Sequence, residues 1–384
     1  MTMVDLTQGS PTARLRVGMI TRFPPSRSGS ALSSSVLADH LSLRHGMTVE
    51  VIRLMMVGEQ PAAGRPVVMD LNPLWRMSGL MASQRANRCD VALLRFDRHF
   101  PPQLVDEFLS DLAVPVILSV EDVGPEEPPE TSLLGEWAGR VDIVVVPSQM
   151  ARRRLEARTG TSANIEVIPQ GSPWRAIALR TGPRRRILSW GFLAPGMGAE
   201  RIIGALTRLE DLKPLPRFRL VGVADPTLSP GDAASYRTSL TRQAKQLGVL
   251  DQIEMVPLHQ RPQDLADDMA QSDLVAVVYD SKTRSASRLL NEAVSTGRPV
   301  VATAFPGAVE MLSSGAGTTV GHNDEQGLAD ALRLYMTDEA EYLRAAAAAS
   351  RLSPKLSCEE VARQFSQLVV GLDRKPELIA KRSL

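Results

Sequence analysis

Hydrophobic positions in the first half of the chain form short continuous runs that are separated by segments with helical spacing. The apolar runs, bounded by polar or turn residues, predict buried strands at residues 15–21, 49–54, 90–94, 114–120, 141–147 and 165–168. Residues 30–44 and 148–158 repeat apolar side chains every three or four positions, which is typical of amphipathic helices. Strands that alternate with helices predict a doubly wound parallel sheet, with ligands at the carboxyl ends of its strands.

The same alternation starts again after an arginine-rich segment, residues 177–186, which Gly182 and Pro183 interrupt. The predicted strands are residues 187–190, 217–223, 253–256, 274–278 and 299–303, and the predicted helices are 199–209, 233–247, 263–271 and 358–370. We therefore expect an N-terminal Rossmann-like domain at 1–178 and a second at 179–356. Residues 357–384 form a terminal helix and tail, and this helix is expected to return to the first domain.

Composition narrows the class of protein. A chain of 384 residues that is 43% hydrophobic is long enough for two separate cores. The formal net charge of +1 argues against an electrostatic hold on nucleic acid, although the arginines at 152–154 and 184–186 leave peripheral contact with anionic lipid open.

The two cysteines, Cys89 and Cys358, are far apart in the sequence and suggest neither a zinc site nor a disulfide framework. No apolar run approaches the ~18 residues that would predict a membrane span. We expect a cytoplasmic protein without a transmembrane segment, with contact at the inner face of a membrane left open. The sequence does not predict the oligomeric state.

The segment SRLLNEAVSTGRPVVATAFPGAVEML, residues 287–312, predicts a helix, a turn at Gly297 and a buried strand. It resembles the donor-site segment of GT-B glycosyltransferases of family four, the glycosyl transferases group 1. PPSRSGSALSSSVLADHL is similar to that family's glycine loop and first helix, and IEVIPQGSP to its strand before the interdomain hinge. The resemblance covers nearly the whole chain. It implies an α/β GT-B fold, with two Rossmann-like domains facing a cleft, and sugar transfer from a nucleotide sugar with retention of configuration.

The resemblance also implies roles for particular residues. Glu292 matches the carboxylate that binds the ribose hydroxyls of the nucleotide, while Arg284 stands where the family has a glutamate near the sugar. Glu121 aligns with a histidine of the family close to the sugar, so Glu121 and Arg284 are the candidate catalytic residues. The candidate donor-binding residues are Glu292, Gly29, Gly196, Gly198, Ser285, Ser287, Arg288, Leu289 and His259. Arg95 and Asp97, which follow a predicted strand, are acceptor-site candidates.

Other interpretations of these residues stay open. Gly29 also fits an ordinary turn with Ser30 as the helix cap, and Gly196 and Gly198 fit a tight turn that packs on a neighbouring helix. Glu121 fits a solvated strand end, and His259 a surface loop. The chain departs most from the family at the loop where an arginine and a lysine hold the donor phosphates, because Phe192 and Met197 stand there.

Three hypotheses follow for the function. The first is a retaining, metal-independent glycosyltransferase, of the hexosyltransferase kind, that moves a sugar from a nucleotide-diphosphate sugar to a hydroxyl of a glycan, lipid or small molecule. It needs no cofactor. The second is a catalytically inactive or partner-dependent GT-B homologue that acts as a binding subunit, which the replaced phosphate-binding cations favour. The third is another GT-B reaction, such as phosphorolysis or epimerisation of a sugar nucleotide.

Overall fold

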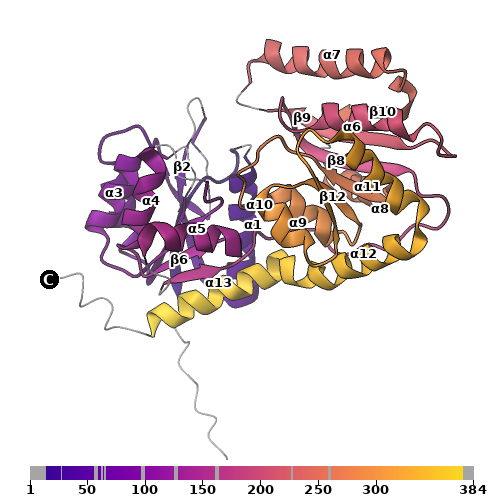
Figure 1. Ribbon diagram of the computed structural model, residues 1–384. Coiled ribbons are helices and arrows are strands. Elements are labelled where there is room, and N and C mark those ends of the chain that lie inside the picture. Colours follow the sequence, from indigo (N-terminus) through magenta and orange to yellow (C-terminus); the bar gives the residue numbers. More distant parts are fainter. Residues whose placement is uncertain are drawn as a thin grey trace, which may run out of the picture. The chain divides into compact units, whose positions relative to one another are not determined.

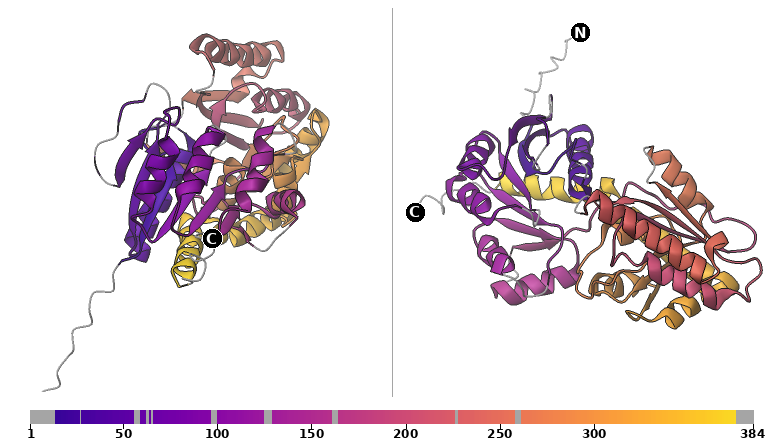
Figure 2. Two further views of the ribbon diagram at one scale, coloured as in Figure 1. Left: turned by 90° about the vertical axis from the view of Figure 1, so that its left-hand side faces the viewer. Right: turned by 90° about the horizontal axis from the view of Figure 1, so that it is seen from above.

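The fold consists of two parallel β-sheets, each covered by helices on both faces (Figures 1 and 2). The computed structural model describes residues 14–374 except 27, 56–58, 62–63, 65, 97–99, 125–128, 161–163, 226–227 and 258–260. This architecture confirms the predicted doubly wound α/β class.

The first sheet has seven strands in the order β3-β2-β1-β4-β5-β6-β7. The strands are β1 (Arg16–Thr21), β2 (Thr48–Leu54), β3 (Val67–Leu71), β4 (Val91–Phe96), β5 (Val116–Val120), β6 (Ile143–Val146) and β7 (Ile165–Val167). The helices between them are α1 (Gly29–His45), α2 (Ser78–Ala86), α3 (Pro102–Asp111), α4 (Pro129–Ala138) and α5 (Gln149–Thr159). In the central strands nearly every side chain is buried, because helices cover both faces of the sheet.

The second sheet has six strands in the order β10-β9-β8-β11-β12-β13. They are β8 (Arg186–Leu193), β9 (Arg217–Ala224), β10 (Ile253–Pro257), β11 (Leu274–Val277), β12 (Val300–Thr303) and β13 (Gly317–Val320). The helices are α6 (Ala199–Leu206), α7 (Pro230–Gln246), α8 (Pro262–Gln271), α9 (Arg288–Ser295), α10 (Pro306–Leu312), α11 (Glu325–Thr337), α12 (Glu339–Leu352) and α13 (Cys358–Asp373). Gly297 follows α9 with φ +74°, the left-handed conformation that the sequence predicted.

Every strand predicted from an apolar run is present, whereas β3 and β13 were not predicted. Both lie at an edge of their sheet, and their exposed or half-exposed side chains give no continuous apolar run. Short edge strands of this kind are fixed by pairing with a neighbour, as Val300 of β12 pairs with Gly317 of β13.

Contacts within the chain divide it into two compact units. The first unit comprises residues 1–120, 133–145 and 362–384, and the second comprises 121–132 and 146–361. The division predicted from the sequence, 1–178, 179–356 and 357–384, follows the two sheets instead, since β7 ends at Val167 and β8 begins at Arg186. The contact-based division differs because it groups residues 121–132 and 146–167 with the second unit.

Each sheet contains two adjacent strands from which the chain continues toward opposite edges of the sheet. In the first sheet the chain moves from β1 to β2 on one side and from β4 to β5 on the other. In the second sheet β8 leads to β9 and β11 leads to β12. Ligands of doubly wound sheets bind beyond the carboxyl ends of such a strand pair, so this topology locates two candidate binding regions.

The guanidinium of Arg298, fully buried before β12, holds three segments of the second unit together. Its Nε donates to the carbonyl of Ser272 (3.0 Å) and its Nη1 to that of Ile177 (2.8 Å). Its Nη2 donates to Ala178 (3.0 Å) and Ala270 (3.3 Å). Burial lowers the pKa of Arg298 from its usual value, yet an arginine stays charged, and each carbonyl receives a charge-assisted hydrogen bond.

Replacing this side chain should therefore destabilise the second unit strongly. We expect Arg298→Ala to lower the free energy of unfolding by about 3 kcal/mol or more, because buried carbonyls lose their donor and a cavity forms. Thermal or urea unfolding measures the change. The exposed Arg351 provides the matched control, and Arg351→Ala should change stability by less than about 0.5 kcal/mol. Equal stability of the two variants would contradict the proposed role of Arg298.

Candidate functional site

The region beyond β8 and β11 is built on two glycines in left-handed conformations. Gly196 and Gly198 have φ angles of +85° and +84°. A Cβ atom at Gly198 would lie 1.4 Å from the carbonyl oxygen of Val278, and the amide of Asp280 donates to the carbonyl of Gly196 (2.9 Å). The loops after the two strands are thus in direct contact, and only glycine fits at position 198. This agrees with the interpretation of Gly198 as part of a tight packing turn.

Glu292 is a buried carboxylate of the region with two side-chain donors. It lies on α9 and is buried, with 7% of its surface exposed. Trp190 Nε1, from β8, donates to Glu292 Oε2 (3.1 Å), and Arg288 Nε donates to Oε1 (2.7 Å). A carboxylate offers about four acceptor positions, so about two remain for other donors such as hydroxyl groups.

The start of α9 carries three of the nine predicted donor-binding residues, Ser287, Arg288 and Leu289. Ser287 caps the helix, because its Oγ accepts from the amide of Leu290 (3.2 Å), and the same oxygen lies 3.2 Å from the hydroxyl of Tyr279. Leu289 is half-buried and packs against the core of the second unit. The first amides of a helix have no acceptor within it, so the end of α9 that holds Arg288 is the positive end of its dipole.

Ser285 is fully buried, and its hydroxyl, amide and carbonyl all form hydrogen bonds within the protein. Its hydroxyl donates to Asp122 Oδ1 and accepts from the amide of Val123 (3.0 Å). Its carbonyl accepts from the hydroxyl of Ser148 (2.8 Å), and its amide donates to Asp122 Oδ1 (3.0 Å). The side chain of Ser285 therefore fixes the turn before α9, and its hydrogen-bonding capacity is already used by protein.

Three arginines of the second unit lie in or next to the loops at this edge of the sheet. Arg201, on α6, and Arg288 are both ion-paired, with Asp280 (2.6 Å) and Glu292 (2.7 Å) respectively. Arg284 instead stacks over the ring of Tyr279 (4.6 Å from its centroid), and it has no ion pair with any residue that the structure describes.

The two positions where the family has cations are apolar in the structure as well. Phe192 is 39% exposed near the end of β8, and Met197 packs against the core. Arg201 was not among the candidate residues predicted from the sequence, although it stands four residues after Met197. Tyr279 is buried, and this burial raises the pKa of its hydroxyl. It therefore stays neutral at physiological pH beneath the guanidinium of Arg284.

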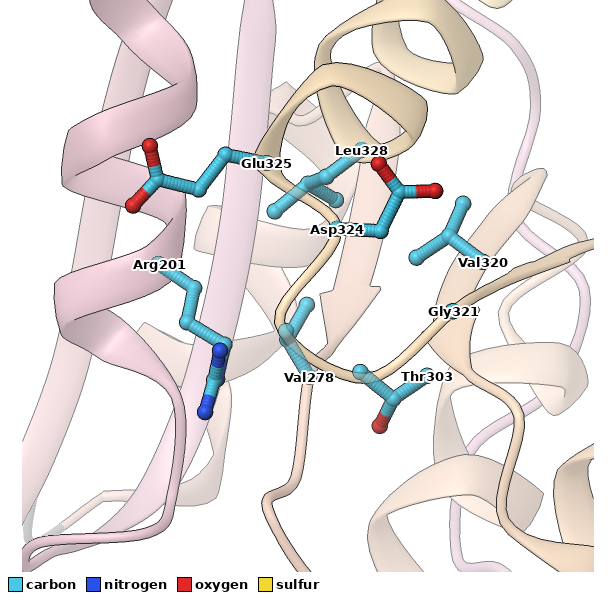
Figure 3. Close-up of a pocket in the computed structure, with 8 residues that line it drawn as sticks. All are labelled: Arg201, Val278, Thr303, Val320, Gly321, Asp324, Glu325 and Leu328. Atoms are coloured by element: carbon cyan, nitrogen blue, oxygen red, sulfur yellow. The ribbon is translucent and has the colours of Figure 1, made fainter.

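A separate small hollow, too narrow to hold a water molecule, lies beyond β11, β12 and β13. Figure 3 shows the side chains of Arg201 and Glu325 on the same side of the hollow, next to α6, and Asp324 at the start of α11. Asp324 caps α11 by accepting from the amide of Gly327 (2.8 Å). Two carboxylates would repel a diphosphate and Arg201 is paired with Asp280, so we do not assign the hollow to a nucleotide.

In the first unit, the loops after β1 and β4 hold the candidate residues Gly29 and Arg95. Gly29 is exposed and is the first residue of α1. The cap of α1 is Ser28, whose Oγ accepts from the amide of Ala31 (3.1 Å), so the prediction of Ser30 as the cap was wrong. Arg95 Nη1 donates to Ser34 Oγ (3.0 Å), and its Nη2 donates to a neighbouring serine hydroxyl of α1.

Of the remaining candidate residues, the structure describes only Glu121. Glu121 is half-buried directly after β5, and its carbonyl accepts from Gln170 Nε2 (2.9 Å). Asp97 and His259 lie outside the described residues. In the part of the chain that the structure describes, no three His, Cys, Asp or Glu side chains are grouped to hold a metal ion. No described helix combines the length and the apolar character needed to cross a bilayer.

Comparison with known families identifies the second half of the chain. Residues 173–352 match the family described as glycosyl transferases group 1. No curated protein sequence matches the chain.

Solved structures resemble the fold over nearly the full length of the chain. HepE from Anabaena, solved in complex with UDP and glucose, has 17% sequence identity and a TM-score of 0.70, over 94% of this chain and 100% of that one. Sucrose-phosphate synthase from Thermosynechococcus elongatus has 16% identity and a TM-score of 0.73, covering 94% and 99%. A glycosyltransferase from Rickettsia africae has 15% identity and a TM-score of 0.70, with the same coverage.

Two parallel α/β sheets of this topology, together with these structural relatives, define the GT-B class of glycosyltransferase folds. The match of residues 173–352 to the glycosyl transferases group 1 family agrees with this fold. The resemblance found in the sequence is thereby confirmed.

The hydrogen bonds of Ser285 predict that its hydroxyl is structural. Ser285→Ala should lower the free energy of unfolding by about 1–3 kcal/mol, because the buried amide of Val123 loses its acceptor. Urea unfolding measures the change, with the exposed Ser313→Ala as the control. Unchanged stability together with weaker nucleotide binding would show instead that the hydroxyl serves a ligand.

Proposed function

We propose that the protein is a retaining glycosyltransferase that moves a sugar from a nucleotide-diphosphate sugar to a hydroxyl group of an acceptor. The observation that carries the proposal is the buried carboxylate of Glu292, held by Trp190 and Arg288 beside the β8 and β11 loops. Two donors orient it and leave room for two ribose hydroxyls. All three residues lie within the segment that matches glycosyl transferases group 1, and this match supports a role of the carboxylate in binding a donor.

The diphosphate of the donor would lie at the positive end of α9. Backbone amides and the helix dipole favour an anion there, and Arg284 and Arg288 add two cations to the same segment. Arg288 compensates in part for the apolar Phe192 and Met197, provided that it exchanges its bond with Glu292 for one with a phosphate. Arg284 has no ion pair to break among the described residues, so it reaches a ligand at lower cost.

In the proposed reaction, the acceptor hydroxyl attacks the anomeric carbon on the face from which the diphosphate departs. The bond between that carbon and the phosphate oxygen breaks, the diphosphate keeps the electron pair, and the hydroxyl proton passes to the diphosphate. Catalysis then consists mainly of positioning and charge stabilisation. Glu121 and Arg284 are proposed to contact the sugar, and Gly29 and Arg95 to line the acceptor side.

The first prediction concerns binding of the nucleotide. Calorimetric titration with a panel of nucleoside diphosphates and nucleotide sugars should show binding, and UDP is the first to test because the HepE structure contains it. Glu292→Ala should weaken binding by at least about tenfold, since two charge-assisted hydrogen bonds to the ribose are lost.

The control for this titration is Glu325→Ala, which removes a carboxylate from the separate hollow and should leave affinity unchanged. If no nucleotide binds to the folded wild type, the donor-site assignment fails. If nucleotides bind but no acceptor receives a sugar, the protein is the inactive or partner-dependent homologue that the apolar residues at 192 and 197 suggested.

The second prediction distinguishes the two arginines by their dependence on phosphate. Arg284→Ala and Arg288→Ala should each weaken the binding of a nucleoside diphosphate by roughly tenfold or more, the equivalent of one charge-assisted contact. Binding of the corresponding nucleoside should change much less. Equal losses for nucleoside and diphosphate would place these side chains away from the phosphates.

Stereochemistry and metal dependence have their own tests. Proton NMR of the product should show the anomeric configuration of the donor, and transfer should persist in a chelator, since we propose metal-independent transfer. A product of inverted configuration would contradict retention. Loss of activity on chelation would contradict metal independence. The acceptor class, a glycan, lipid or small molecule, and the cytoplasmic location stay predictions from the sequence.

A further inference from the structure

The turn between β3 and α2 exposes an unusual cluster of large apolar side chains. Leu74 is 68% exposed, Trp75 57%, Met77 57%, and Met81, one helical turn further on, 41%. We call these residues and Arg76 the apolar turn. Single exposed apolar residues are common on proteins, but adjacent ones that include a tryptophan mark an interaction surface.

The apolar turn has a defined conformation. The amide of Trp75 donates to the carbonyl of Asn72 (3.0 Å), and the amide of Ser78 donates to the carbonyl of Trp75 (3.3 Å). The hydroxyl of Ser78 also donates to the carbonyl of Asn72 (2.7 Å). Met77 has φ +66°, a left-handed conformation that disfavours every residue with a side chain except where surrounding contacts impose it. The side chains are therefore presented by a fixed backbone.

Packing of the core does not account for these large residues. The buried face of α2 carries only small residues, which are Ser78, Gly79, Ala82, Ser83 and Ala86. A Cβ atom at Gly79 would lie 2.4 Å from the carbonyl oxygen of Leu104 on α3, so the two helices are in close backbone contact. The usual distribution is reversed here, because small side chains point inward and the methionines and tryptophan point outward.

The charged side chains of the segment that holds the apolar turn have one sign. The stretch from Leu71 to Cys89 contains three arginines and neither aspartate nor glutamate. Arg76, in the middle of the turn, and Arg88 are exposed, while Arg85 is paired with Glu50 (2.6 Å). A carboxylate from α3 lies nearby in space, since Glu107 Oε2 accepts from the amide of Gly79 (3.2 Å). Tryptophan, leucine and methionine beside exposed arginines are the combination that enters the headgroup region of an anionic bilayer.

We propose that the apolar turn docks the first unit on the surface of an anionic lipid bilayer. Leu74, Trp75 and Met77 enter the interface, and Arg76 lies at the phosphate level. A second copy of the chain fits less well, because a two-fold interface places the same patch against itself and brings like charges together. The proposal goes beyond the proposed function and does not depend on it.

Vesicle flotation tests the proposal on the full-length protein. Wild type should bind phosphatidylcholine vesicles that contain phosphatidylglycerol, and binding should fall in high salt. Leu74→Ser combined with Trp75→Ser should reduce binding by about tenfold or more, because two apolar side chains lose their burial. Arg76→Glu should reduce it for the anionic vesicles.

The matched control is Leu43→Ser. Leu43 is 82% exposed near the end of α1, outside the apolar turn, and its loss should leave binding unchanged. Circular dichroism and thermal unfolding confirm that each variant is folded. Quenching of tryptophan fluorescence by brominated lipid should disappear in Trp75→Phe while vesicle binding persists.

The proposal is overturned if wild type ignores anionic vesicles, or if the double variant binds them as wild type does. It is also overturned if phosphatidylcholine alone binds equally well, since charge then has no part. A wild-type dimer that becomes monomeric in the double variant, without vesicle binding, would show that a second copy covers the apolar turn.

Discussion

The buried guanidinium of Arg298 is the interaction on which the second unit depends. It satisfies the carbonyls of residues 177 and 178, which precede the second sheet, and those of Ala270 and Ser272, which precede β11. A buried carbonyl without a donor costs free energy, and these four have one donor group in common. The segment before β8 is thereby fixed to the strand that lies beside β8 in the sheet, and the loops beyond both strands take their positions from that pair.

In the candidate site, some polar groups are fully used in hydrogen bonds within the protein, whereas others keep acceptor positions for a ligand. Ser285 and Ser287 hold the turn and cap α9, and Gly198 allows the β8 loop to touch the β11 loop. Glu292, by contrast, is oriented by two donors and keeps acceptor capacity. A rigid loop framework around one oriented carboxylate is the arrangement that positions a ligand without induced ordering. The cations near this framework differ from the family pattern, and Arg284 and Arg288 are the residues that we propose to bind the phosphates.

The first unit shows a second kind of constraint. Close contact between α2 and α3 requires small residues on the inner face of α2, and the large apolar residues of the same segment are outside. Exposing these large apolar side chains to water costs free energy, and their contacts show no role for them in the fold. A surface ligand offsets that cost, and the excess of arginine indicates that the ligand is anionic.

The sequence by itself determined the class of fold and most of the strands. Apolar runs such as those of β1, β5 and β12 are unambiguous because both faces of a parallel sheet are buried, and the family resemblance rested on the local segment around Glu292. Only the tertiary structure decided the partners. Trp190 stands 102 positions before Glu292 and Asp122 stands 163 before Ser285, so no local pattern could pair them. Edge strands β3 and β13 and the exposure of Trp75 were likewise decided by packing, because each depends on what lies beside the residue in space.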